Sequence, residues 1–312
     1  ASSSNAGTAN LTAAGFAVDL AAASGANGWS VSNAGNSTSV SLTGSSKADT
    51  LIGGNGAETL SGGAGNDSLD GGAGDDLALL AGNQSDYRFG VRDGVVITSG
   101  ADGVDQFSNI ERLKWGSAAE ISLASLSASG SNVGLFYRDI GNGTFGYRLP
   151  DAYTGSVRGI VNQEITGDTN DIILGTQQAD FINAGAGDDA VDGGAGNDVI
   201  DGGLGSNFLT GSAGGDTFFL DGRAAATSIT WSTITDFSPG EHVTIWGYQP
   251  GVSRLLWVAS DGADGYKGAT MHSDLDGNGV IDTSLTFSGL TQAQLPAPTY
   301  GSIEGNDYII FG

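Results

Sequence analysis

The chain has 312 residues, enough for more than one domain, and it is strongly acidic, with 35 Asp and Glu against 11 Lys and Arg. This charge argues against binding to nucleic acid or to an anionic membrane, because both require positive charge, and it suits cations as ligands. The chain contains no cysteine, which excludes disulfides and thiolate metal sites and is compatible with export.

Residues 1–43 are rich in Ala, Ser, Asn and Gly and have few charges. Scattered apolar residues within FAVDLAAASGANGWSV (16–31) suggest short strands of a solenoid or a sandwich, with disorder as the alternative. The first ten residues lack the basic region and apolar core of a cleavable signal peptide. Because no initiator Met is present, we expect a processed product or a piece of a longer chain. No apolar run approaches the roughly 20 residues of a membrane-spanning helix.

A frame of nine residues begins at residue 44 and appears again at residue 166. The first array (44–79) reads GSSKADTLI, GGNGAETLS, GGAGNDSLD and GGAGDDLAL. The second array (166–219) reads TGDTNDIIL, GTQQADFIN, AGAGDDAVD, GGAGNDVID, GGLGSNFLT and GSAGGDTFF. The eighth position of each unit is apolar, although Ala78 is small: Leu51, Leu60, Leu69, Ala78, Ile173, Ile182, Val191, Ile200, Leu209 and Phe218.

The repeat predicts a turn followed by a short strand. Residues one to six are Gly-rich, and glycine allows positive φ and a close approach of backbones. Residues seven to nine are too few for anything but a strand, whose eighth residue points into a thin apolar core. Two units form one coil of 18 residues, so each turn stacks on the turn 18 residues later. A flexible Gly-rich linker is the alternative, but it does not explain the regular Asp or the apolar eighth position.

Acidic side chains occupy the sixth position of almost every unit. The stacking places Asp67 against Asp49 and Asp198 against Asp180, and such like charges in register are destabilising unless a cation lies between them. Carboxylates and Gly carbonyls form an all-oxygen cage, which suits Ca²⁺ rather than a soft metal. Pairing each turn with the next but one allows about two ions in the first array and about four in the second. The sixth-position residues are Asp49, Glu58, Asp67, Asp76, Asp171, Asp180, Asp189, Asp198, Asn207 and Asp216.

The repeat matches the pattern G-G-x-G-x-D-x-U-x and so resembles the calcium-binding nonapeptide repeat of the RTX (repeats-in-toxin) family. The match covers under a third of the chain. This resemblance implies parallel β-rolls that bind several Ca²⁺ ions, export by a type I secretion system, and folding outside the cell. Glu58, Asn207 and Ala78 depart from the pattern, and we expect those units to bind weakly or to close the roll.

The segments between the arrays read as small β-rich elements. In residues 80–165, short strand-like runs alternate with Asp-Gly and Ser-Gly turns, and this segment holds seven of the eleven basic residues. We expect an antiparallel element packed against the end of the roll. Aromatic residues in 131–150 fit a core role better than stacking on sugars. Residues 220–301 are similar, and STITDFSPGEHVTIWGY (232–248) predicts a strand, a turn and a strand.

Two further acidic stretches lie outside the arrays. DLDGNGVID (274–282) places Asp274, Asp276, Asn278 and Asp282 at positions 1, 3, 5 and 9 of an EF-hand-type calcium loop, with Gly279 at position 6. Position 12 is Leu rather than Glu, and the flanking residues read as strands. A calcium loop and an ordinary Asn-Gly hairpin are equally compatible with this segment.

The last residues, 302–312, fit the nonapeptide frame loosely. Asp307 is in the sixth position and Ile309 in the eighth, so we expect the start of a third roll and a further metal ligand.

No catalytic motif is present. The two histidines, His242 and His272, are not part of H-E-x-x-H, and G-x-S-x-G does not occur. His242 reads as a strand-end residue. A pair of acids suited to glycoside hydrolysis stays open, although calcium ligation explains the aspartates better. We therefore expect a protein that is not an enzyme.

The sequence predicts an all-β chain in which two calcium-binding parallel β-rolls alternate with small β-rich inserts. The expected segments are 1–43, roll 44–79, insert 80–165, roll 166–219, insert 220–301 and the start of a roll at 302–312. The expected function is a calcium-dependent structural module on a bacterial cell surface, such as a surface layer. Its expected partners are calcium, other copies of the chain and cell-surface polysaccharide. An accessory module of a secreted enzyme or toxin, or a sugar-binding adhesin, is the alternative.

Overall fold

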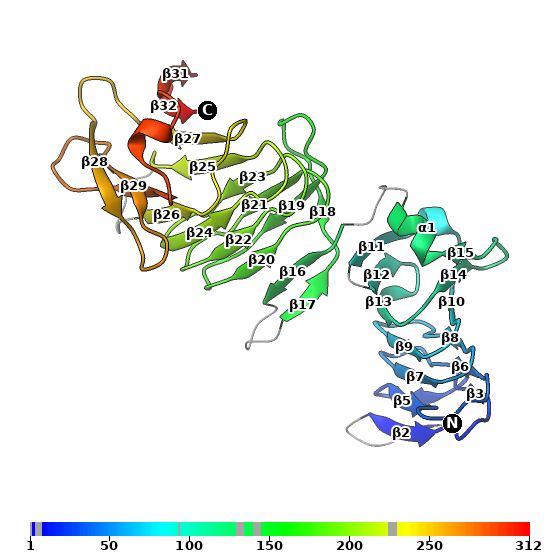
Figure 1. Ribbon diagram of the computed structural model, residues 1–312. Coiled ribbons are helices and arrows are strands. Elements are labelled where there is room, and N and C mark those ends of the chain that lie inside the picture. Colours follow the sequence, from blue (N-terminus) through cyan, green and yellow to red (C-terminus); the bar gives the residue numbers. More distant parts are fainter. Residues whose placement is uncertain (1, 4–7, 93, 129–133, 140–144, 224–229) are drawn as a thin grey trace. The chain divides into compact units, whose positions relative to one another are not determined.

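The computed structural model describes all residues except 1, 4–7, 93, 129–133, 140–144 and 224–229. The chain divides into two compact units, residues 1–135 and 136–312 (Figure 1). Each unit has two β-sheets that enclose a thin apolar core. The prediction of an all-β chain built on parallel β-rolls is confirmed, and the described residues contain one α-helix, α1 (Leu123–Ala128). Among these residues, no helix has the length and apolar character needed to cross a membrane.

In the first unit, successive strands alternate between the two sheets, and two strands with their turns form one coil. The first sheet contains, in spatial order, β11 (Arg88–Arg92), β12 (Val95–Gly100), β13 (Gly103–Ser108), β9 (Ser68–Gly72), β7 (Thr50–Gly54), β5 (Trp29–Ser32) and β2 (Ala9–Thr12). The second contains β15 (Ile121–Ser122), β14 (Arg112–Trp115), β10 (Leu77–Leu80), β8 (Thr59–Ser61), β6 (Ser41–Thr43) and β3 (Val18–Asp19). Outside them lie the pair β1 (Ser2–Ser3) and β4 (Ser24–Gly25) and the 3₁₀ turn η1 (Gln84–Asp86).

The described part of residues 1–43 belongs to the solenoid. Leu11 pairs with Val31, and Val31 pairs with Leu51, so the roll begins before the first repeat and its early coils are 20 residues long. Of the alternatives left open by the sequence, the structure shows the solenoid. These coils lack the Gly-rich turns of the array, which explains why the nonapeptide frame did not reveal them.

Residues 80–165 differ from the single insert that the sequence suggested, because the boundary between the two units falls at residue 135. Strands β11, β12 and β13 form an antiparallel meander, as expected, but β13 also pairs in parallel with β9 and β14 pairs in parallel with β10. These strands therefore continue both sheets of the first roll. The predicted Gly-Asn-Gly turn at 141–143 lies outside the described residues.

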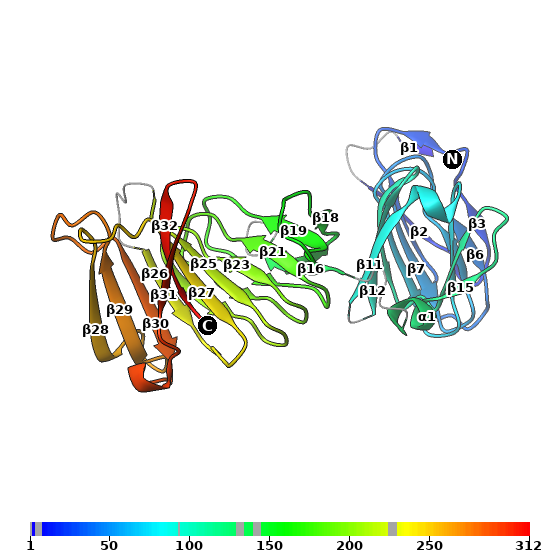
Figure 2. The same cartoon turned by 90° about the horizontal axis from the view of Figure 1, so that it is seen from above.

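The second unit repeats the same construction on a larger scale (Figure 2). One sheet contains β17 (Phe145–Arg148), β16 (Phe136–Asp139), β20 (Ile172–Leu174), β22 (Ala190–Asp192), β24 (Ser206–Thr210), β26 (Thr230–Ile234), β30 (Thr283–Ser288), β29 (Gly268–Asp274) and β28 (Arg254–Asp261). The other contains β18 (Asp151–Ala152), β19 (Asn162–Ile165), β21 (Asp180–Asn183), β23 (Val199–Asp201), β25 (Thr217–Asp221), β27 (His242–Trp246), β32 (Asn306–Phe311) and β31 (Thr299–Ile303). The 3₁₀ turn η2 (Gln292–Gln294) precedes β31.

Antiparallel strands close both ends of the second roll. At one end, β17 and β16 pair antiparallel against β20, and β18 pairs antiparallel with β19. At the other, β26 and β27 first add one more parallel coil after the second array. The antiparallel β30, β29 and β28 then end one sheet. This parallel interior with antiparallel ends satisfies the need of a solenoid for capping elements.

The expected third roll at 302–312 is not formed. Residues 306–311 form β32, which pairs antiparallel with both β27 and β31. The hairpin turns at Glu304 and Gly305, both with positive φ, which is the geometry of a tight two-residue turn. Ile309 is fully buried, as its place in the frame predicts. The apolar period of two therefore led to a strand, but the short turn sends that strand back antiparallel instead of into a new coil.

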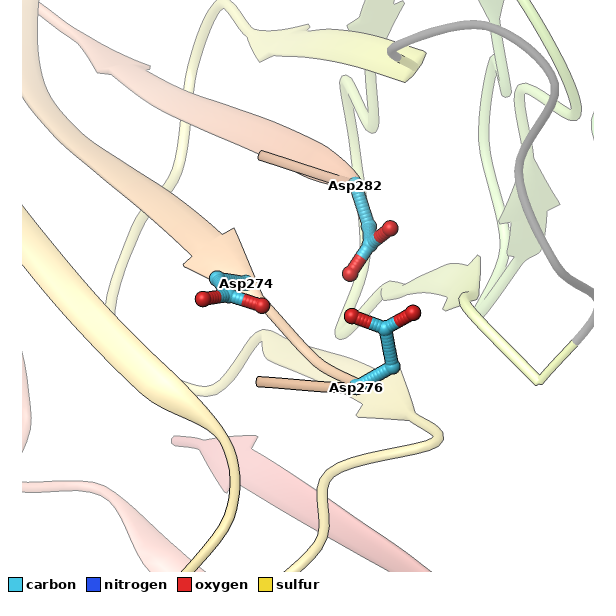
Figure 3. A group of neighbouring side chains, drawn as sticks. All are labelled: Asp274, Asp276 and Asp282. Carbon is cyan, nitrogen blue, oxygen red and sulfur yellow. The ribbon is translucent and has the colours of Figure 1, made fainter. Parts of the chain in front are cut away.

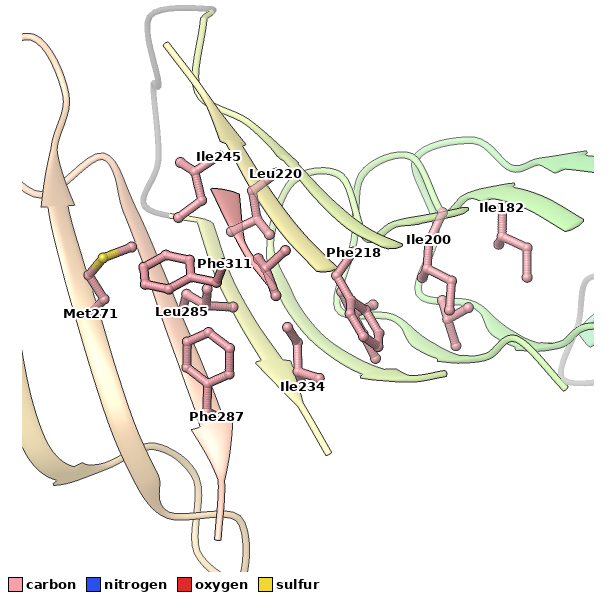
Figure 4. Packing of buried hydrophobic residues seen from close by; sticks show 14 of the residues in the cluster. Ile182, Ile200, Phe218, Leu220, Ile234, Ile245, Met271, Leu285, Phe287 and Phe311 are labelled. Carbon is pink, nitrogen blue, oxygen red and sulfur yellow. The ribbon is translucent and has the colours of Figure 1, made fainter. Parts of the chain in front are cut away.

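The core of each unit is a row of eighth-position side chains. Within the arrays each residue pairs with the residue 18 later, as in Leu51 with Leu69 and Ile200 with Phe218, so the predicted stacking is confirmed. All ten eighth-position side chains are buried, none more than 2% exposed. In the second unit this row runs into a larger cluster that includes Met271, Phe287 and Phe311 (Figure 4).

Truncation of one core side chain tests this packing against its direct neighbour in the chain. We expect Ile173→Ala to lower the free energy of unfolding by about 2–5 kcal/mol, because Ile173 is fully buried and leaves a cavity. Ile172→Ala is the matched control, since Ile172 is 45% exposed, and it should cost under about 1 kcal/mol. Denaturant unfolding in saturating calcium measures both values. Equal losses would contradict the inward direction of the eighth position.

Candidate metal centres

The sixth-position residues of both arrays are buried, although nine of the ten are carboxylates. Each precedes a strand, and none is more than 5% exposed. Carboxylates are rarely buried in this way unless they are paired or coordinate a metal, because the loss of hydration disfavours their charge. The solenoid therefore keeps two internal rows of acids in each unit, beside its apolar core.

Backbone hydrogen bonds connect the acids of successive coils. The Asp171 N–H donates to Asp189 Oδ1 over 2.8 Å, and the Asp180 N–H donates to Asp198 Oδ1 over the same distance. The pairs predicted from the 18-residue spacing are thus brought together by the structure. The same bond recurs from Asp49 to Asp67, Glu58 to Asp76, Asp189 to Asn207 and Asp198 to Asp216.

The second carboxylate oxygen divides the units into two classes. In three units it accepts the N–H of the residue at position two: Ser45 donates to Asp49, Gly54 to Glu58 and Thr176 to Asp180. In five others, this oxygen is buried and has no hydrogen-bond donor among the described residues. These five oxygens are the Oδ2 atoms of Asp67, Asp76, Asp189, Asp198 and Asp216.

The division follows the backbone of the turn. The last two units of the first array and the last four of the second have positive φ at positions two and four, as at Gly72 (90°) and Gly74 (140°). These six units hold the five unpaired oxygens, and the sixth places the unpaired amide nitrogen of Asn207 there. In the remaining four units, positions two and four do not have positive φ. The Gly-rich turn thus keeps the position-two N–H from the carboxylate.

The ninth position of the preceding unit supports this turn, a role that the sequence reasoning missed. Gly194 N–H donates to Asp192 Oδ1 over 3.0 Å, two residues back, which is an Asx turn. The side chain at position nine therefore takes the N–H that would otherwise bond the acid at position six. The signal was visible as a recurring Asp or Asn at the end of the unit. The same bond is made by Asp70 to Gly72, Asn183 to Gly185 and Asp201 to Gly203.

The close stacking explains why glycine is required in these turns. A Cβ atom on Gly74 would overlap the carbonyl oxygen of Gly56 in the coil before it, and one on Gly214 would overlap that of Gly196. Carbonyl oxygens of one turn therefore lie directly against the next turn. Together with the unpaired carboxylates, they make the space between coils rich in oxygen.

Burial also perturbs the acidity of these groups. Desolvation raises the pKa of Asp198 to about 8, and the charges of Asp180 and Asp216 act in the same direction. Burial raises the pKa of Asp67 and that of Asp189 to about 6. The backbone N–H bonds oppose these shifts without cancelling them. Full ionisation near neutral pH thus requires a positive charge nearby.

The rows extend beyond the arrays through residues that the sequence reasoning missed. Asp67 N–H donates to Asp105 Oδ1 over 2.9 Å, and Asp76 N–H donates to Glu111 Oε2 over 2.7 Å. Asp105 is buried, and burial raises its pKa to about 7. Its signal was GADGVDQFS (100–108), a unit of the same frame with Ala at position two and Phe107 buried at position eight.

The remaining predicted ligands lie apart from the rows. Asp274, Asp276, Asn278 and Asp282 lie at the turn between the antiparallel strands β29 and β30, as expected for a loop flanked by strands. Asp307 lies in β32 opposite Ser302, so it has no place in a repeat turn. The prediction of a roll ligand at Asp307 depended on the third roll, which the structure does not form.

This donor set determines the class of ligand. Carboxylate and backbone carbonyl oxygens are hard ligands, and the chain offers neither thiolates nor histidines in the rows. A flexible site of this kind suits Ca²⁺. The unpaired oxygens of Asp67, Asp76, Asp189, Asp198 and Asp216, with carbonyls of the adjoining turns, are the groups that would hold the ions.

Comparison with known proteins agrees with this assignment. The family model of the RTX calcium-binding nonapeptide repeat matches residues 42–78, 165–200 and 192–222. Ca²⁺ is therefore the ligand of the repeats, at several sites. No curated protein matches the sequence. One similar solved structure is the extracellular lipase LipA from Serratia marcescens, with 15% identity over 85% of this chain, a TM-score of 0.28, and 40% of the lipase covered. The chain thus spans less than half the length of that lipase.

Neighbouring aspartates in one turn provide a test of the row. Asp189→Asn keeps the acceptor for Asp171 but removes the charge, so we expect fewer bound Ca²⁺ ions and a calcium midpoint of folding raised about tenfold or more. Asp188→Asn changes the exposed residue beside it and should leave both values close to wild type. Equilibrium dialysis and circular dichroism measure them. Equal behaviour of the two variants would exclude Asp189 as a ligand.

The raised pKa values predict how stability without calcium depends on pH. A folded-state pKa above the unfolded value of about 3.9 means that protonation favours the fold, fully below about pH 4. This contribution is lost as the pH rises through about 6 to 8, the folded-state values of Asp67, Asp189 and Asp198. In EDTA, the strand signal in circular dichroism should increase when the pH is lowered from 8 to 5. A constant or decreasing signal would be inconsistent with buried, uncompensated acids.

Proposed function

We propose that this chain, a carrier of RTX calcium-binding repeats, is a structural module of a secreted bacterial surface protein, which folds on Ca²⁺ outside the cell and assembles with further copies. The observation that carries the proposal is the pair of buried acid rows in each of two units. Without a cation these rows resist stacking, since each coil adds a buried carboxylate against the last. Ligand binding then becomes folding free energy.

Calcium concentration explains how such a chain passes from the cell to its surface. At low calcium the net charge of −24 and the thin core oppose folding, and an unfolded chain is what a secretion channel requires. Extracellular calcium modules have dissociation constants of about 10⁻⁴–10⁻³ M, so sites of this strength are loaded only outside the cell. The type I route is part of the proposal, by resemblance to RTX proteins.

The outer strands of the second unit support assembly with other chains. β28 ends one sheet and β31 ends the other, and an edge strand presents unpaired backbone groups to a further strand. Both carry exposed apolar side chains, since Leu256 is 61%, Tyr300 57% and Ile303 53% exposed. Such edges fit a protein whose partner is another β-sheet.

The histidines support a role without catalysis. His272 Nδ1 lies 2.8 Å from Ser284 Oγ, and its Nε2 lies 3.4 Å from Asp261 Oδ2, an arrangement similar to a hydrolytic triad. However, Ser284 is 1% exposed and lies in β30, between β26 and β29, so no substrate reaches its hydroxyl. His242 is the first residue of β27. Both positions are explained by the architecture.

The tryptophans favour the structural role over sugar binding. Trp115 is fully buried, and Trp257 packs against the core of the second unit. Trp29, Trp231 and Trp246 are all partly buried. Flat sugar-binding surfaces require open aromatic faces, and no tryptophan of this chain is fully exposed.

Assembly on addition of calcium tests the proposal. We expect light scattering and electron microscopy to show large ordered assemblies at millimolar Ca²⁺, with folding preceding growth. Leu256→Lys, on the edge strand β28, should fold normally but assemble poorly, because charge on an edge opposes pairing. Ile172→Lys is the control: it is similarly exposed, but β20 has a neighbour on both sides. Folding without any growth would favour an accessory module of a secreted enzyme or an adhesin.

A further inference from the structure

A cluster of three carboxylates lies in the second unit, outside both arrays. The segment 274–282 turns the chain from β29 to β30, and Asp274, Asp276 and Asp282 each place an oxygen within 4.8 Å of the others (Figure 3). The family match does not reach these residues. The repeat sites therefore do not explain this cluster.

Backbone hydrogen bonds hold one oxygen of each carboxylate. Gly279 N–H donates to Asp274 Oδ2 over 2.9 Å, and Leu275 N–H donates to Asp282 Oδ2 over 2.6 Å. Asn278 N–H donates to Asp276 Oδ1 over 3.0 Å. The loop thus orients three negative groups toward one another. Asn278 uses its side-chain amide within the loop, donating to Asp276 and accepting from Val280, so it supports the loop rather than adding a fourth oxygen.

The buried oxygen of Asp274 points to a cation. Asp274 is 7% exposed, and its Oδ1 is buried without a hydrogen-bond donor among the described residues. No Lys, Arg or His of the described chain forms an ion pair with any of the three acids. Arg254 is opposite Asp274 in the β28–β29 pairing, but its side chain is exposed and makes no such pair. A buried carboxylate beside two others needs a compensating charge.

We propose that this loop binds one Ca²⁺ ion, independently of the repeats. The acids occupy positions 1, 3 and 9 of a calcium loop, and Gly279 at position 6 has the positive φ (90°) that its turn requires. Position 12 is Leu285, which is buried in the core, so the bidentate Glu of the EF-hand has no counterpart. With one carboxylate fewer, the affinity falls in the range of extracellular modules, about 10⁻⁴–10⁻³ M.

The surroundings provide room for the remaining ligands. Asp276 and Asp282 border an open cavity of about 600 Å³, which Asp307 and Arg223 also line. Water entering this cavity reaches the acids and completes the six to eight oxygens that Ca²⁺ takes. Leu275, between two of the ligands, is buried in the core cluster of the second unit. An ion here therefore ties the β29–β30 turn to the end of the roll.

Removal of two ligands that lie away from the core tests the site. In the full chain, Asp276→Asn/Asp282→Asn should bind one Ca²⁺ ion fewer than wild type, by equilibrium dialysis with elemental analysis. Asp264→Asn is the matched control: an exposed acid before β29 in the same unit, paired only with Lys267, and it should bind the wild-type number. Equal stoichiometry in all three proteins would overturn the proposal.

Hydrogen exchange separates this site from the repeats. Calcium should slow exchange of the peptide 274–282 in wild type but not in the double variant, whereas peptides from 62–79 and 184–219 should respond equally in both. Asp276→Asn alone, at an exposed position, gives the same readout if the double variant is unstable. Unchanged exchange of 274–282 in wild type on adding calcium would refute the site. The proposal does not depend on assembly, so failure of either leaves the other standing.

Discussion

Carboxylates stacked in register inside the coils are the constraint on which the structure depends. A parallel solenoid places the same residue of each coil directly over the last, so one buried Asp becomes a row of buried Asp. Hydrogen bonds such as that from Asp180 to Asp198 hold the row together but satisfy only one oxygen of each carboxylate. The other oxygen, at Asp67, Asp189 or Asp198, is left to a ligand. Calcium and folding are thereby linked through the same atoms.

The repeat turn exists in two states, and a short sequence difference selects between them. When position two donates its N–H to the acid, as Thr176 does to Asp180, the carboxylate is satisfied within its own turn. When the preceding unit ends in Asp or Asn, as at Asp192, that N–H is taken and the carboxylate oxygen stays free. The first units of each array therefore build the start of the roll, and the later units hold the free oxygens. This arrangement places calcium-dependent coils between a calcium-independent start and an antiparallel end.

The periodic part of the chain could be predicted from sequence, and the rest could not for identifiable reasons. The ninefold frame gave the register of 18 and the burial of residues such as Leu51 and Ile200, because identical coils must stack identically. The coils of residues 9–43 escaped, since their turns are neither glycine-rich nor of constant length. Asp105 was missed because its unit has Ala at position two. The last strand was placed in a roll, but the tight turn at Glu304 and Gly305, a local property of two residues, reverses it.

A calcium titration of the purified chain at constant pH 8, followed by far-ultraviolet circular dichroism, tests the central claim most directly. At this pH most of the buried acids are ionised when exposed to water, so only a bound cation relieves their repulsion in the stack. The account predicts a largely disordered chain in EDTA and a cooperative gain of strand signal at millimolar Ca²⁺ but not at equal Mg²⁺. A chain that is fully folded in EDTA, with no further change on adding calcium, would contradict it.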